Sequence, residues 1–303
     1  MGISQYIKEI GRGPRGSKPL TREQAADLFG QLLDGNVTDL EIGAFCLAMR
    51  IKGETPEEMC GFLGAAHSRM ALFPASDRPV IVLPSYNGAR KLPVLTPLLA
   101  LLLAREGLPV LLHGMRTEAR RTLASDVLLA LGVPALTAPE KIATGSVAHI
   151  ETGYLHAALA RLLKVREVVG LRNAGHSIVK LMNPCAGPAV VVTSYTHPEY
   201  YDMLQATFGA LHMTALLSRG LEGEVATDPR RTPRYDAFVA GVHQLLQEQQ
   251  PGTAADVPGL PTEIDIDTTA RYTQDVLDGR LPVPPALAQQ VEHILHLAAQ
   301  TPP

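Results

Sequence analysis

Short apolar runs alternate with helical segments along the middle of the chain, and this alternation constrains the fold more than any other feature. Four runs have the length and residue types of buried strands: residues 80–83, 109–112, 189–193 and 213–217. Three segments between them carry apolar residues at helical spacing: residues 93–106, 122–131 and 198–208. Strands and helices that alternate in this way form βαβ units. The sequence therefore predicts an α/β fold with a mainly parallel central sheet.

The N-terminal part is predicted to be helical only. A capping box begins one helix at Thr21, similar signals begin a second at Thr38, and Thr55 followed by proline begins a third. Two further helices, about residues 154–164 and 174–182, interrupt the strand–helix alternation and could pack on the first three. We expect a small N-terminal helical bundle domain, residues 1–74 plus about 154–186, and a larger α/β domain, residues 75–153 plus 187–303.

Composition and cysteine usage indicate a cytoplasmic globular protein. The 303 residues, 46% hydrophobic and 19% charged, are enough for a large core. The three cysteines, Cys46, Cys60 and Cys185, lack metal-ligand spacing, so we expect buried, reduced thiols. The N-terminus lacks the apolar stretch of a signal peptide, and the longest apolar run, residues 98–104, is too short to span a bilayer. We expect a cytoplasmic protein with no membrane partner.

Charge is distributed unevenly along the chain. The net charge of -3 argues against a polyanion partner, but it is an average. Residues 84–121 carry six basic and two acidic side chains, and residues 161–181 carry five basic and one acidic. Residues 251–303 carry seven acidic and two basic side chains. Because the electric field of a protein depends on where its charges lie, a local basic surface remains compatible with this composition.

Three loops follow predicted strands, and ligands of such sheets bind beyond the carboxyl ends of the strands. The first loop carries Ser85, Tyr86, Asn87 and Gly88, followed by Arg90 and Lys91. It lies where a phosphate-cradling loop would lie, but one glycine makes a poor cradle of backbone amides. It is either a phosphate contact or a solvated connection.

The second loop begins with His113 and Gly114 and carries three arginines within six residues: Arg116, Arg120 and Arg121. Arginine suits bidentate phosphate contact, although a solvated basic face is the alternative. His113 could act as a general base, but a lone histidine at a strand end is more often structural.

The third loop carries Glu222 and Glu224, and two carboxylates near a strand end can hold Mg²⁺ bound to a diphosphate. Four arginines flank them, which argues against a metal site: Arg219, Arg230, Arg231 and Arg234. No nucleophile elbow, Walker loop, dinucleotide fingerprint or zinc spacing occurs in the sequence. We therefore assign no catalytic residue and no metal ligand.

Four stretches carry a family resemblance: residues 42–55 (IGAFCLAMRIKGET), 125–133 (SDVLLALGV), 172–184 (RNAGHSIVKLMNP) and 220–222 (GLE). With the order of elements, they make nearly the whole chain resemble the anthranilate phosphoribosyltransferase family, which has the glycosyltransferase family 3 or nucleoside phosphorylase-type fold. The resemblance is closer to the YbiB-type branch. It implies a helical domain that mediates dimerisation and an α/β domain that binds phosphoribosyl diphosphate and Mg²⁺ in the enzymes.

The sequence departs from the enzyme pattern at the motifs that hold the diphosphate. The family's GTGGD loop falls on residues 85–89, where only Gly88 is similar, and the lysine of its KHGN motif is Leu112 here. Its paired Asp-Glu falls on Glu222 and Gly223. These losses should remove most charge stabilisation of a diphosphate leaving group, so the resemblance implies a degenerate active site without cofactor.

The YbiB-type branch implies a non-enzymatic homodimer that binds DNA and RNA, single- or double-stranded, through basic grooves with little sequence specificity. The side chains expected to contact the phosphate backbone are Arg90, Lys91, Arg116, Arg120, Arg121, Arg172, Lys180, Arg219, Arg230, Arg231 and Arg234. Tyr86 could stack on a base.

Two alternatives stay open. In one, the chain is a phosphoribosyltransferase for an unknown aromatic or carboxylate acceptor, with Arg116, Arg120 and Arg121 replacing Mg²⁺ at the diphosphate. Arg172, which matches the anthranilate-contacting arginine of the family, would then hold the acceptor. In the other, the same cleft binds a protein partner, and the chain is a scaffold or regulator.

Overall fold

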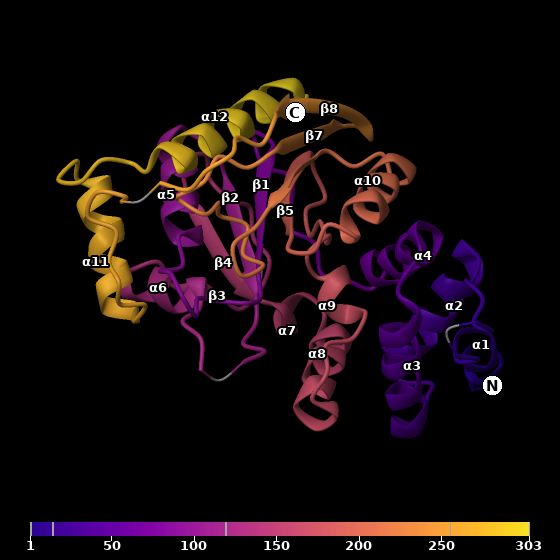
Figure 1. Cartoon of the computed structure of the whole chain (residues 1–303). Coiled ribbons are helices and arrows are strands. Elements are labelled where there is room, and N and C mark those ends of the chain that lie inside the picture. Colours follow the sequence, from indigo (N-terminus) through magenta and orange to yellow (C-terminus); the bar gives the residue numbers. More distant parts are fainter. Residues whose placement is uncertain (1, 14, 119, 255, 303) are drawn as a thin grey trace.

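The fold is built on one eight-stranded sheet, seen in a computed structural model that describes residues 2–13, 15–118, 120–254 and 256–302 (Figure 1). The strands are β1 (Val80–Ser85), β2 (Val110–Gly114), β3 (Ala135–Leu136), β4 (Val147–Glu151), β5 (Ala189–Tyr195), β6 (Ala215–Arg219), β7 (Tyr235–Val239) and β8 (Val242–Gln247). Their order is β3-β4-β2-β1-β5-β6-β7-β8. All neighbours from β3 to β6 are parallel, and β7 and β8 are antiparallel. The predicted α/β fold with a mainly parallel sheet is confirmed.

Alternate residues of each central strand face two different cores, which is why the runs are apolar throughout. Ile81 and Leu83 of β1 belong to a core shared with α5 (Thr96–Arg105) and α12 (Pro285–Gln300). Val80 and Val82 belong to the core on the other face, which continues into the N-terminal helices. Helices α6 (Ala124–Ala130), α10 (Tyr200–Ala210) and α11 (Ile266–Leu277) complete the α/β part.

The N-terminal helices form a bundle beside the sheet, and their start signals act as predicted. The bundle consists of α1 (Ser4–Ile10), α2 (Arg22–Leu33), α3 (Asp39–Lys52) and α4 (Pro56–His67). Thr21, Thr38 and Thr55 each close a capping box at the start of α2, α3 and α4. The rings of Phe29 and Phe62 lie 5.0 Å apart at its centre.

Three helices inserted between β4 and β5 bring the chain back toward this bundle (Figure 1). They are α7 (Thr152–Leu155), α8 (Ala157–Val169) and α9 (Gly175–Ile178). Residues of α2, α3 and α8 line one small gap together, among them Leu32, Ile42 and Leu162. The expectation that the interrupting helices could pack on the first helices is therefore met for α8.

The sheet has a topological switch point between β1 and β5. The chain moves from β1 to β2 on one side, and from β5 to β6 on the other. The connections that leave the carboxyl ends of these strands therefore diverge, which opens a crevice for ligands. The loops after β1, β2, β5 and β6 all meet at this edge.

Several local predictions differ from the structure. The predicted helix at residues 174–182 is only Gly175–Ile178, and β4, the β7–β8 hairpin and α11 were not predicted. All three cysteines are buried and free, as expected, and burial raises the pKa of Cys46 to about 11. Across the described residues, no helix is both long enough and apolar enough to cross a bilayer.

Candidate functional site

The loop after β1 is filled by a side chain of the protein itself. The buried Glu224 carboxylate accepts hydrogen bonds at Oε1 from the backbone N–H groups of Asn87 (2.9 Å) and Gly88 (2.8 Å). Its Oε2 accepts from the hydroxyls of Ser85 (2.6 Å) and Thr96 (3.0 Å). Backbone amides at this place in an α/β sheet are the donors that bind phosphate. Here they already hold an anion.

A second carboxylate fixes the end of the same loop. Glu222 Oε2 accepts from the backbone N–H groups of Arg90 (2.9 Å) and Lys91 (3.0 Å). Gly223 between the two glutamates has a φ of +83°, and a Cβ there would lie 1.8 Å from Asn87 Nδ2. Glycine is therefore required for both glutamates to reach the loop.

Magnesium does not fit this pair of carboxylates. Both oxygens of Glu224 and one of Glu222 are used by the loop, and the remaining Glu222 oxygen lies 3.7 Å from the Arg90 guanidinium. Mg²⁺ requires oxygen ligands that point at a common centre. Among the described residues, no group of three or more His, Cys, Asp or Glu side chains could hold a metal ion.

Tyr86 and His113, expected near a ligand, lie inside the protein. The Tyr86 side chain is 2% exposed, and its hydroxyl lies 2.8 Å from His113 Nδ1 and 2.7 Å from Thr152 Oγ1. The prediction that Tyr86 could stack on a base is therefore wrong. Burial lowers the pKa of His113 to about 3, so this imidazole is neutral at physiological pH. Gly114 packs directly against the Ser85 backbone, where a side chain would clash.

The loop after β2 gathers three arginines around one carboxylate. Glu118 contacts Arg121 (3.0 Å), Arg166 (2.9 Å) and Arg172 (3.3 Å). Burial raises the pKa of Glu118, but the Arg166 hydrogen bond and the neighbouring arginine charges outweigh burial and leave that pKa below its usual value. One carboxylate cannot neutralise three guanidinium groups, so the cluster keeps an excess of positive charge.

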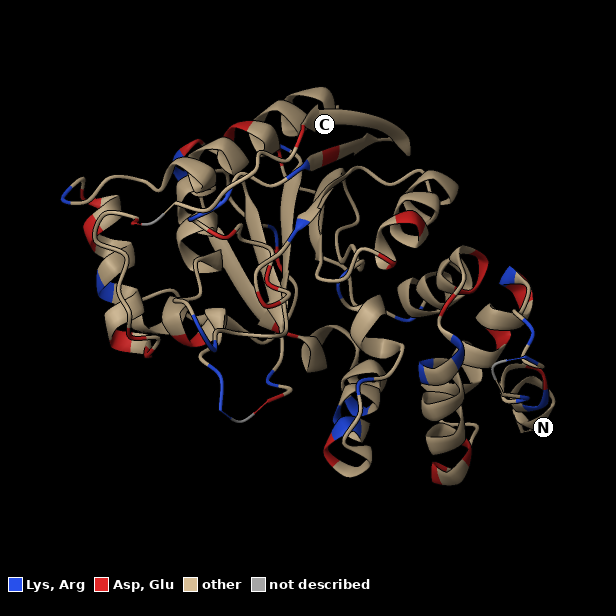
Figure 2. Ribbon diagram, in the orientation of Figure 1, with Lys and Arg blue, Asp and Glu red and all other residues tan. Residues whose placement is uncertain are grey.

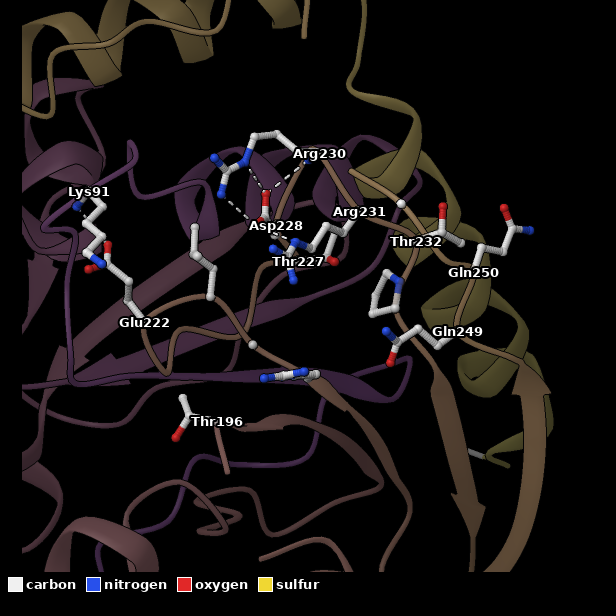
Figure 3. A pocket seen from close by; sticks show the side chains of 15 residues that line it. Lys91, Thr196, Glu222, Thr227, Asp228, Arg230, Arg231, Thr232, Gln249 and Gln250 are labelled. Atoms are coloured by element: carbon white, nitrogen blue, oxygen red, sulfur yellow. Dashed lines mark hydrogen bonds and ion pairs between the residues drawn. The ribbon is translucent and has the colours of Figure 1, made fainter. Parts of the chain in front are cut away.

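Two cavities lie on either side of the loop that follows β5. The outer cavity, of about 340 Å³, is bordered by the loop after β6 (Figure 3). Its charged lining residues are Lys91, Arg219, Arg230, Arg231, Glu222 and Asp228. Figure 3 shows the Arg230 guanidinium directed at Asp228, which it contacts through two hydrogen bonds of 2.9 Å.

The inner cavity, of about 420 Å³, lies between α3, α9 and the loop after β5. Its charged lining residues are Arg50, Arg172, Lys180, Glu54 and Glu199. Burial and the charge of Arg172 lower the pKa of Lys180 to about 8, and its Nζ donates to the Gly223 carbonyl (3.0 Å). Thr196 lines both cavities, so they are neighbours across the loop after β5. Together they present seven Lys and Arg side chains and four carboxylates.

The structure separates the basic residues predicted to bind nucleic acid into two groups. Six line the cavities: Lys91, Arg172, Lys180, Arg219, Arg230 and Arg231. The other five do not line them: Arg90, Arg116, Arg120, Arg121 and Arg234. Arg116 is paired with Asp126 of α6, and Arg234 contacts the buried Asp236. Figure 2 shows basic residues on α3, on α8 and on the loop after β2, all on the side of the sheet edge described here.

Sequence reasoning missed Arg50, Arg166, Tyr195 and Tyr200. The sequence predicted helices at or near both arginines, but not which groups their side chains would face. The tyrosines had a usable signal, because three of the eight tyrosines fall within residues 195–201, directly after a predicted strand.

Comparisons with known proteins show which family the chain belongs to. The helical bundle domain of a glycosyl transferase family matches residues 4–70. The uncharacterized protein YbiB of Escherichia coli (strain K12) is 37% identical over 298 residues, which are 96% of this chain and 92% of that protein. An anthranilate phosphoribosyltransferase of Methylobacterium nodulans is 32% identical over 74% of this chain and 67% of its own length. The chain belongs to the anthranilate phosphoribosyltransferase-like family.

Solved structures of this family share the fold of the chain. An anthranilate phosphoribosyltransferase from Thermus thermophilus aligns with a TM-score of 0.76 over 99% of this chain and 90% of that chain, at 21% identity. The enzyme from Saccharomyces cerevisiae in complex with PRPP and Mg aligns with a TM-score of 0.71 over 98% of this chain and 89% of that chain, at 14% identity. The helical bundle and the mainly parallel sheet are therefore those of the family.

Proposed function

We propose that this family member binds nucleic acid, DNA or RNA, through the phosphate backbone and with little sequence specificity. The observation that supports the proposal is the pair of neighbouring cavities with seven Lys and Arg side chains at the ligand-binding edge of the sheet. A nucleic acid is a chain of closely spaced anions, and side chains that neutralise several phosphates together bind it without reading bases.

The loop after β1 argues against the transferase alternative. Diphosphate would have to displace Glu224 from four hydrogen bonds and Glu222 from two backbone amides. The arginine clamp imagined for a rebuilt site is not assembled, because Arg116 is held by Asp126 and Arg121 by Glu118. We therefore propose binding without catalysis and without a cofactor.

A homodimer is part of the proposal. The α3 helix carries Leu40, Leu47 and Ile51 at 84%, 47% and 60% exposure, and their spacing of seven and four residues puts them on one face of the helix. Val168 at the end of α8 is 90% exposed. Exposed apolar stripes of this kind mark protein interfaces, and a second copy of the helical bundle is the partner we propose.

We also propose the cytoplasm as the location of this protein. All three cysteines are free and buried, and burial raises the pKa of each thiol. Unpaired cysteines suit a compartment that keeps thiols reduced.

Fluorescence anisotropy with a labelled single-stranded oligonucleotide tests the proposed binding. Protein at micromolar concentration should bind at low salt, and affinity should fall linearly with salt on logarithmic axes, since released counterions drive binding. Arg219→Glu should weaken binding by about tenfold or more at low salt, because it replaces a cavity cation by an anion. Arg271→Glu, an exposed change on α11, is the matched control.

Two results would contradict the proposal. Absence of binding at low salt overturns nucleic-acid binding itself. A heat of binding in calorimetry with phosphoribosyl diphosphate and Mg²⁺ would restore the transferase alternative, whereas flat heats up to millimolar ligand would exclude it.

A further inference from the structure

The inner cavity differs from the outer one in having an aromatic wall. Tyr195 and Tyr200 line it, together with the imidazole of His197. Tyr195 ends β5, His197 lies in the loop after it, and Tyr200 begins α10, whereas aromatic residues make up only 5% of the chain. The outer cavity has no aromatic residue among the described residues that line it.

The Tyr195 ring packs against Tyr201, which is itself held by Asp236 and Arg234. The ring of Tyr195 meets the edge of Tyr201 at a centroid distance of 5.6 Å. The Tyr201 hydroxyl donates to Asp236 (3.0 Å), and the Arg234 guanidinium lies 5.4 Å from the Tyr201 ring centre. A ring held in this way loses little conformational freedom when a flat ligand stacks on it.

Two buried polar atoms of the same cavity have no partner. His176 is 7% exposed and Ser194 is 5% exposed, and both side chains line the cavity. His176 Nε2 and Ser194 Oγ make no hydrogen bond with any described residue. A buried polar group without a partner costs roughly 1–3 kcal/mol. Both atoms are almost inaccessible to solvent, so a ligand in the cavity would reach them only after the side chains turn toward it.

The cations of the inner cavity lie at its border with the outer one. Lys180 contacts the carbonyl of Gly223, next to Glu222, which lines the outer cavity, and Thr196 lines both cavities. Arg172 and Arg50 also line the inner cavity. Its volume of about 420 Å³ falls in the range of pockets that enclose small organic ligands.

We propose that the inner cavity takes one unpaired base of a single strand whose phosphate backbone follows the outer cavity. The base stacks on Tyr195 and Tyr200, and its flanking phosphates meet Lys180 and Arg172. The inference rests on the proposed nucleic-acid binding and adds a preference for single strands, because a base inside a duplex is already stacked and paired and cannot enter the cavity.

Competition between two matched oligonucleotides tests this inference. One is a single strand of mixed sequence, and the other has the same length and charge but abasic sites throughout. The intact strand should bind about tenfold more tightly, the gain expected from stacking of one base. It should also bind more tightly than a duplex at the same salt concentration. Tyr200→Ala should remove the difference between intact and abasic strands, and Tyr200→Phe should keep it.

Tyr154→Ala is the matched control, since Tyr154 is a half-exposed tyrosine of α7 that lines neither cavity. It should leave the difference unchanged. Equal affinity of the native protein for intact and abasic strands, or tighter binding of the duplex, overturns the base pocket and leaves backbone binding in place. If neither oligonucleotide binds at low salt, the proposed function fails as well, so the two failures are distinguishable.

Discussion

The loops after β1 and β5 start from neighbouring strands, yet their polar groups differ in hydrogen bonding. Polar groups are paired after β1 and partly unpaired after β5. After β1, the backbone N–H groups of Asn87, Gly88, Arg90 and Lys91 are all bonded to Glu224 or Glu222. After β5, a cavity with three cations contains a histidine and a serine without partners. One side of the switch point is closed by the protein, and the other remains available to a ligand.

The β1 loop offers backbone amides as an anion site does, but the anions that it binds are the protein's own glutamates. The β1 loop has the position of a phosphate loop, but its anion is a side chain that cannot leave the molecule. The cations that line the cavities lie on the β5 and β6 side, where Arg230 and Arg231 share Asp228 and Arg172 shares Glu118 with two other arginines. The proposed function therefore uses the β5 side of the switch point and not the β1 loop, and four changes can break or sharpen that comparison.

The largest expected effect is on stability. Glu224→Ala would leave two backbone N–H groups and two hydroxyls without an acceptor in a buried place, and removal of one member of such a network costs roughly 3–5 kcal/mol. Urea unfolding should show that loss in the free energy of unfolding. Glu140→Ala, an exposed change, should stay within about 0.5 kcal/mol. An equally stable Glu224→Ala variant would show that the loop does not depend on its internal anion.

The next effect is on affinity. Replacement of both Arg219 and Arg231 by alanine should weaken oligonucleotide binding by roughly tenfold or more and reduce the salt slope by about two, one for each lost phosphate contact. The paired control replaces Arg90 and Arg116, which do not line the cavities, and should change affinity less than about twofold. The opposite ranking in anisotropy titrations would place the binding surface at the β1 and β2 loops.

A smaller effect concerns pH. The Lys180 pKa of about 8 lies below the usual value, mainly because of burial, so its ammonium loses charge between pH 7 and pH 9. Affinity for polyanions should fall about fivefold over that range. Stability should respond in the opposite direction, because the unfolded chain keeps its proton to higher pH and the cost of burying the charge disappears. Lys180→Arg should remove the pH effect on affinity, and an unchanged pH profile would contradict this role for Lys180.

The smallest effect is expected at Tyr86. Tyr86→Phe removes the hydroxyl that lies between His113 and Thr152 and should cost about 1 kcal/mol in the free energy of unfolding. Affinity for the oligonucleotide should not change, since the ring is buried on the closed side of the switch point. Thermal unfolding and anisotropy on the same samples check both statements, and a loss of affinity without a loss of stability would argue for a direct contact.

The central sheet was predictable because four of its strands are apolar on both faces, and this pattern is visible without tertiary information. Strand β4 was missed because it carries His149 and Glu151, and β7 because it buries Asp236, which is compensated by Arg234 and His243. Such compensation comes from the folded surroundings. A strand with a buried charge therefore does not look like a strand in the sequence.

The sequence predicted which residue types gather at the site, but not which arginines pair with which carboxylates. Several arginines follow apolar runs in the sequence, which predicted that they gather near the carboxyl ends of the strands. Which arginines remain available depends on carboxylates brought from elsewhere, such as Glu118, which contacts Arg172 from 54 positions earlier. The filling of the β1 loop by Glu224, 136 positions after Gly88, required the three-dimensional fold.

The detour of the chain through α7, α8 and α9 determines when the N-terminal helices can finish folding. Leu32 and Ile42 pack beside Leu162 of α8, a residue that is synthesised only after β1, β2 and β4. During synthesis, part of the apolar surface of the first helices therefore stays uncovered while more than a hundred further residues are added to the chain. Chaperone demand on the nascent chain should be highest in that interval and should end once α8 emerges.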